Sequence, residues 1–166
     1  MNFFWLDANA FVKRYIVENG TPLINYLFTH VSLEKMFCLL EGVGEIISVI
    51  VRIRNRGEIT TEGFNHAKQL FDDEIIHRDK VKLMLPTENQ ITASWELIDQ
   101  HSINSTDAIL LQCALDRTHE LRANGDNLVL VSSDKRLMRA AMIEGLFTFN
   151  PEIDNQASLD ALIDPP

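Results

Sequence analysis

The chain has 166 residues, of which 46% are hydrophobic and 23% charged, with 7 glycines and 5 prolines. These values fit one globular domain with a buried core and exclude a disordered or fibrous chain. No apolar run approaches the roughly 20 residues needed to span a bilayer, so a membrane protein is not expected. The two cysteines, Cys38 and Cys113, lie far apart and outside any CxxC motif. The sequence therefore predicts a cytoplasmic protein without a disulfide scaffold or a zinc site.

The formal net charge of −9 bears on nucleic-acid binding. Non-specific binding depends on many contacts between Lys or Arg and phosphates, and an acidic chain must concentrate its positive charge to make them. A nuclease function therefore requires that some acids serve another purpose, such as metal binding, and that basic residues gather near the site.

The first half of the chain predicts two strands and several amphipathic helices. Residues 3–6 are wholly apolar and predict a buried strand bounded by Asp7, and the apolar run at 36–40 predicts a second strand. The predicted helices cover residues 8–15, 21–30, 42–55 and a segment from Thr60 or Thr61 to Arg78. The helix over 42–55 is expected to present one apolar face formed by Val43, Ile46, Ile47, Ile50 and Ile53.

The second half contains a continuous apolar run at residues 128–131, which is typical of a strand buried on both faces of a parallel sheet. Two further strands are predicted over residues 80–85 and 146–149. The predicted helices cover residues 87–98, 107–122, 134 to about 144, and part of 152–166. We expect inward positions for Leu110, Leu111, Ala114 and Leu115, and core positions for Trp5 and Trp95.

Helices that alternate with short buried strands predict a three-layer α/β/α fold with a mainly parallel sheet of about four or five strands. One domain is expected over residues 1–151, with 152–166 as its C-terminal extension. Ligands of such sheets bind beyond the carboxyl ends of the strands, where the strand order reverses. Asp7 and Asp134 each follow an apolar strand directly or nearly so, which makes them candidate site residues.

Each candidate acid also has an ordinary structural interpretation. Asp134, beside two serines, could cap a helix, and Asp107 could be a first-turn acid that complements the helix dipole. Asp107 nevertheless heads the apolar face of its helix, where a carboxylate needs a counter-charge. Glu45 lies near Arg52, so a surface ion pair explains it equally well. If these acids converge, they require cations, and oxygen ligands favour Mg²⁺ or Mn²⁺.

Four short motifs, each with one of these acids, occupy residues 6–15, 45–60, 104–114 and 130–151. In order and spacing they resemble the motifs of PIN-domain proteins, most of all the VapC toxins of bacterial toxin–antitoxin pairs. The resemblance implies a PIN-like fold and metal-dependent hydrolysis of RNA. It also implies that the catalytic and metal-binding quartet consists of Asp7, Glu45, Asp107 and Asp134. Glu41, one helical turn before Glu45, is a rival for the second position.

The same resemblance assigns supporting residues and partners. Asn9 and Ser132 match small polar positions that orient the ligands or the scissile phosphate. Independently of the resemblance, the predicted fold suggests basic residues that could rim the site and hold RNA phosphates, although solvated helix faces explain each of them as well. They are Lys13, Arg14, Arg52, Arg56, Lys135 and Arg136. A cognate antitoxin protein and a homodimer are expected. The competing hypothesis is a non-catalytic PIN-like module that binds RNA or a protein; a receiver-like domain fits less well, because the first strand lacks paired acids.

Overall fold

The computed structural model describes residues 1–77 and 80–165. These residues contain a five-stranded parallel sheet with the order β3-β2-β1-β4-β5. The strands are β1 (Asn2–Leu6), β2 (Met36–Leu39), β3 (Lys82–Met84), β4 (Asn127–Val131) and β5 (Phe147–Phe149). Strands β2 and β3 are added on one side of β1, and strands β4 and β5 are added on its other side. The strand order therefore reverses between β1 and β4, which is where parallel sheets bind ligands.

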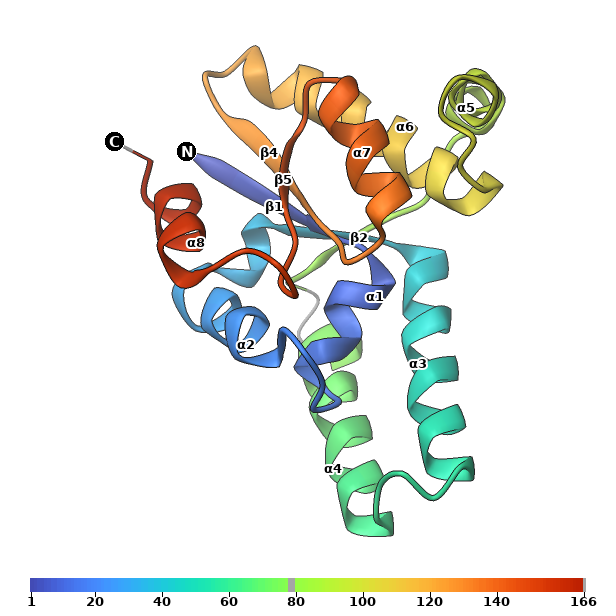
Figure 1. Cartoon of the computed structure of the whole chain (residues 1–166), viewed down its shortest axis with the longest axis vertical. Coiled ribbons are helices and arrows are strands. Elements are labelled where there is room, and N and C mark those ends of the chain that lie inside the picture. The colour runs from blue at the N-terminus through green and yellow to red at the C-terminus, as the bar shows by residue number, and fades with distance from the viewer. Residues whose placement is uncertain (78–79, 166) are drawn as a thin grey trace.

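Helices cover both faces of this sheet (Figure 1). They are α1 (Ala8–Phe11), α2 (Thr21–His30), α3 (Leu40–Asn55), α4 (Thr61–Phe71), α5 (Glu88–His101), α6 (Ser105–Arg122), α7 (Lys135–Ile143) and α8 (Gln156–Ile163). Residues of α5, α6 and α7 join one apolar cluster, and residues of α1 to α4 and α8 join the other. The hairpin of α3 and α4 projects away from the sheet (Figure 1). The predicted three-layer α/β/α fold is thus confirmed.

Strand β4 shows why its apolar run is continuous. Leu128 and Leu130 belong to the cluster under α6 and α7, whereas Val129 and Val131 belong to the cluster on the opposite face. Successive side chains of a strand point to opposite faces, so a strand covered on both faces needs apolar residues at every position. None of the helices within the described ranges is both long and apolar enough to cross a membrane.

Two predicted core positions are wrong. Trp95 is 63% exposed and Ile47 is 44% exposed. Helix α5 buries Ser94, Leu97 and His101, so Trp95 points away from that buried face. An amphipathic helix offers only one stripe to the core, and apolar residues beside the stripe remain in solvent.

Several helix boundaries also differ from prediction: α1 ends at Phe11, α3 begins at Leu40 and α5 extends to His101. Helix α6 begins at Ser105, not at Asp107, because Asn104 caps it by accepting a hydrogen bond from the Asp107 N–H at 2.9 Å. The helix predicted from Thr60 or Thr61 to Arg78 begins at Thr61 but ends at Phe71, and a π-helical turn follows at Asp72–His77. Arg78 lies outside the described residues.

Gly20→Ala is expected to destabilise the fold by about 2–3 kcal/mol, because it combines two costs. Gly20 has φ +89°, and a Cβ there would lie 2.8 Å from the carbonyl oxygen of Pro151. Gly125 is a matched control: its φ is +79°, but no neighbouring atom lies within 4 Å of an added Cβ. Gly125→Ala should therefore cost only about 1 kcal/mol in urea unfolding. Equal losses in the two variants would show that the contact with Pro151 does not matter.

Candidate active site

The carboxyl edge of the sheet brings together the residues that follow β1 and β4. Leu6 pairs with Val131 in the parallel register, and the N–H of Asp7 donates to the carbonyl oxygen of Val131 at 3.0 Å. Asp7 and Ser132 are therefore neighbours in space although 125 residues separate them. The Ser132 hydroxyl donates to Asp7 Oδ2 at 2.8 Å.

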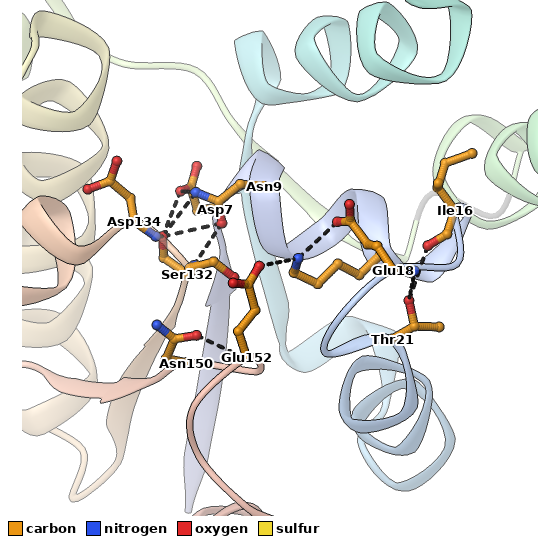
Figure 2. A network of polar contacts seen from close by, with 11 residues as sticks. Asp7, Asn9, Ile16, Glu18, Thr21, Ser132, Asp134, Asn150 and Glu152 are labelled. Atoms are coloured by element: carbon orange, nitrogen blue, oxygen red, sulfur yellow. Dashed lines mark hydrogen bonds and ion pairs between the residues drawn. The ribbon is translucent and has the colours of Figure 1, made fainter. Parts of the chain in front are cut away.

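Asn9 of α1 completes this polar network (Figure 2). Its Nδ2 donates to Asp7 Oδ2 at 2.5 Å, and its Oδ1 accepts from the N–H of Ser133 at 2.9 Å. Asn9 and Ser132 thus hold the same oxygen of Asp7, and both do so with neutral donors. These are the two residues to which the resemblance assigns a supporting role, and in the structure both donate to Asp7.

Asp134 follows β4 and caps α7. Its Oδ1 accepts from the backbone N–H of Arg136 at 2.7 Å and of Leu137 at 3.0 Å. Its own N–H donates to Ser132 Oγ at 3.0 Å, which links it to the network around Asp7 (Figure 2). The capping role considered for Asp134 is therefore present, and it occupies only one carboxylate oxygen.

A cleft of about 290 Å³ joins the first three motifs. Its lining residues are Asp7, Asn9, Glu45, Asn104, Ser105, Thr106, Asp107 and Leu110. Glu45 also lines an adjoining cleft of about 390 Å³ together with Ser48 and Arg52. Glu41 is not among the residues that line either cleft. The structure therefore favours Glu45 over Glu41 as the acid that faces Asp7 and Asp107.

Two acids of the cleft, Asp7 and Asp107, have raised pKa values. Burial raises the pKa of Asp7 from 3.8 to about 6, and the charges of Asp107 and Glu45 add to this effect against the hydrogen bond from Ser132. Burial also raises the pKa of Asp107 to about 6, with further contributions from Asp134 and Glu45 and an opposing one from Arg136. Asp7, Glu45 and Asp107 therefore line one cleft, and Asp134 lies close enough for its charge to act on Asp107.

The donor chemistry of this edge fits a hard divalent cation. In Asp7, Asp107 and Asp134, one carboxylate oxygen is held by a hydrogen bond, and no side chain in residues 1–77 and 80–165 donates to the other. The described residues include no group of three acids, histidines or cysteines already close enough to hold a metal ion. Mg²⁺ does not need such a group, because it is commonly bound through one or two carboxylates and keeps several waters.

The predicted basic residues divide into two groups. Lys13 is 3% exposed, and its Nζ donates to Glu18 at 2.9 Å and to Glu152 at 2.7 Å. Arg14 donates to both carboxylate oxygens of Glu74, at 2.6 and 3.2 Å. Both cations are thus bound within the fold, and we do not retain them as phosphate contacts.

The remaining basic residues are exposed on helix surfaces. Arg52 lines the cleft beside Glu45, and the charge of Arg136 acts on Asp107. Arg56 pairs with Glu58 at 3.7 Å, and Lys135 opens α7. Arg52, as a residue that lines the cleft with Glu45, and Arg136, through its charge effect on Asp107, are therefore the predicted cations that the structure links to the carboxylates.

The fold and the site together define the class of this protein. It is a three-layer α/β domain with carboxylates at the carboxyl edge of a parallel sheet. No protein-family profile and no curated protein sequence matches the chain. Solved structures similar to it include PAE2754 from Pyrobaculum aerophilum (TM-score 0.60, 14% identity, 98% of both chains) and FitAcB from Neisseria gonorrhoeae (0.60, 14%, 92% of this chain and 100% of that chain). The structure of FitAB bound to an IR36 DNA fragment is also similar, with a TM-score of 0.61 and 12% identity over 93% of this chain and 99% of that chain. At these identities the likeness concerns the fold alone, and the fold is PIN-like.

Proposed function

We propose that the chain is a metal-dependent endoribonuclease that acts in the cytoplasm as the toxin of a VapBC-type toxin–antitoxin pair. The observation that carries the proposal is the cleft shared by Asp7, Glu45 and Asp107, with Asp134 beside it. No Lys or Arg of the described residues forms an ion pair with any of the four acids. Among these residues, no ion pair therefore neutralises the negative charge of the cleft, and a divalent cation would offset it.

In this proposal the residues of the cleft bind the metal ion, orient its ligands and hold the phosphates of the RNA. Asp7 and Asp107, with Glu45 and Asp134, would hold Mg²⁺ or Mn²⁺. The cation would supply an activated water and offset the charge that develops on the phosphate. Asn9 and Ser132 donate to Asp7 and would keep it in one orientation, and Arg52 and Arg136 would hold phosphates beside the cleft.

The partners rest on the resemblance and on the structural neighbours. The neighbours share the fold of this chain, and one of them, FitAB, was solved bound to an IR36 DNA fragment. These facts support a nucleic-acid ligand and a cognate antitoxin protein for this chain. RNA as the substrate and a homodimer as the assembled state are parts of the proposal.

Metal-dependent cleavage of RNA by the purified protein tests the activity. We expect cleavage with Mg²⁺ or Mn²⁺, none with EDTA, and at least about a 100-fold loss in Asp107→Asn, because a ligand matters more than the outer partners whose loss costs 10–100-fold. Asp99→Asn is the control, since Asp99 is an exposed acid on α5. Cleavage that survives both EDTA and Asp107→Asn would exclude this mechanism.

A non-catalytic module that binds RNA or a protein is the second candidate. It is favoured by the net charge of −9 and by the separation of the acids, which are not assembled around one point within the described residues. A titration with millimolar Mn²⁺ separates the two functions. A catalytic metal site predicts a higher unfolding temperature with Mn²⁺, whereas a binding module predicts no change and no cleavage of any RNA.

A further inference from the structure

Asn104 contacts Asp107 in two ways. Its Oδ1 accepts the Asp107 N–H at 2.9 Å, which caps α6, and its Nδ2 donates to Asp107 Oδ2 at 2.7 Å. The first bond satisfies a backbone donor of the helix, as N-caps do. The second bond serves no backbone group and acts only on the carboxylate. Asn104 itself lines the cleft next to Asp107.

Another asparagine cap of the same chain lacks the second contact. Asn155 caps α8 by accepting from the Ser158 N–H at 3.0 Å. In the part of the chain that the structure describes, the Asn155 amide donates to no carboxylate. The third residue of α8 is Ser158, so the extra bond of Asn104 depends on the carboxylate that Asp107 supplies at the same position of α6.

The arrangement around Asp107 repeats the one around Asp7. Asn9 holds Oδ2 of Asp7 with its amide, and Asn104 holds Oδ2 of Asp107 with its amide. In both cases the donor is neutral, so it fixes the carboxylate without cancelling its charge. An Arg or Lys at either position would form an ion pair that competes with a bound cation.

We propose that Asn104 is a positioning residue of the cleft, which holds Asp107 Oδ2 so that Oδ1 remains available to a divalent cation. This inference rests on the proposed function, because it assigns Asp107 as a ligand. Partners that orient metal ligands typically contribute 10–100-fold to metal affinity. The loss of the Asn104 amide should therefore weaken metal binding even if the helix cap is retained.

Calorimetric titration with Mn²⁺ tests the proposal on three variants. Asn104→Ala removes both contacts, whereas Asn104→Gly removes the amide and keeps most of the capping energy, because glycine is tolerated at N-caps. Asn155→Ala removes a cap that lines neither of the two clefts with Glu45, and it serves as the control. We expect Mn²⁺ dissociation constants raised about 10-fold in both Asn104 variants and unchanged in Asn155→Ala.

Three outcomes are informative in different ways. If Asn104→Gly binds Mn²⁺ like the wild type while Asn104→Ala does not, Asn104 acts only as a cap and the proposal is overturned. If both Asn104 variants bind normally but Asp107→Asn does not, positioning fails while the metal site stands. If the wild type binds no Mn²⁺, or binds it as Asp107→Asn does, the proposed function itself fails.

Discussion

Asp7→Asn is expected to abolish metal-dependent cleavage and, in the absence of metal, to make the protein more stable at about pH 8. Asp7 is 8% exposed and has no cationic partner among the described residues, and burial raises its pKa to about 6. Ionising it therefore costs the folded state free energy that an amide does not cost. The amide keeps an oxygen to accept the hydrogen bonds of Asn9 and Ser132, so the local network survives.

The pKa of Asp7 determines how the stability difference between Asp7→Asn and the wild type depends on pH. An acid whose pKa is higher in the folded than in the unfolded state binds its proton more tightly when folded, so stability falls as the pH rises from about 4 to about 6. Above that window the penalty is constant and on the order of 2–3 kcal/mol. Asp7→Asn should lack this loss, so the difference between variant and wild type should appear at about pH 8 and vanish near pH 4.

Mn²⁺ should reverse the order of stability. Binding to the folded state at 100 times the dissociation constant contributes about 2.7 kcal/mol, and only the wild type retains Asp7 as a ligand. Urea unfolding at two pH values, with and without Mn²⁺, measures all four combinations. A variant that is less stable than the wild type in metal-free buffer at about pH 8 would show that Asp7 is a structural acid. A variant that still gains stability from Mn²⁺ would remove Asp7 from the metal site.

Much of the sheet edge could be predicted from sequence, because its determinants are local. The run at residues 128–131 is apolar at every position, which indicates a strand covered on both faces, and a polar segment follows it directly. The same holds for residues 3–6 and Asp7. Parallel strands align their carboxyl ends, so the meeting of Asp7 with Ser132 follows from two local patterns and one rule of topology.

The partners of the basic residues could not be predicted, because they depend on tertiary contacts. Lys13 is paired with Glu152, which lies 139 positions later in the chain, and Arg14 with Glu74, 60 positions later. No spacing rule links such positions. By contrast, Asn104 stands three residues before Asp107, a spacing typical of an N-cap, and this signal could have placed the start of α6.

Arg14→Met should destabilise the fold by about 3–5 kcal/mol, the usual cost of leaving one partner of a buried ion pair uncompensated. Arg14 and Glu74 have side-chain exposures of 23% and 9%, so water compensates Glu74 poorly once the guanidinium is gone. The Arg14 guanidinium also lies 5.1 Å from the centroid of the Phe28 ring, where the sulfur of Met can replace part of the contact. The double variant Arg14→Met/Glu74→Leu should recover most of the loss, because an apolar pair of similar volume replaces both charges.

The double variant also decides whether Arg14 contacts RNA. Binding is measured in the Asp7→Asn background, where the RNA stays intact, and Arg52→Ala provides the comparison because Arg52 lines the cleft. We expect unchanged RNA affinity in the double variant, and in Arg52→Ala a weaker affinity with a salt dependence reduced by about one phosphate contact. A stable double variant with weakened RNA binding would return Arg14 to the RNA surface. Since the fold is then intact, that result could not be attributed to unfolding, and the pairing with Glu74 would be one of two roles for the same guanidinium.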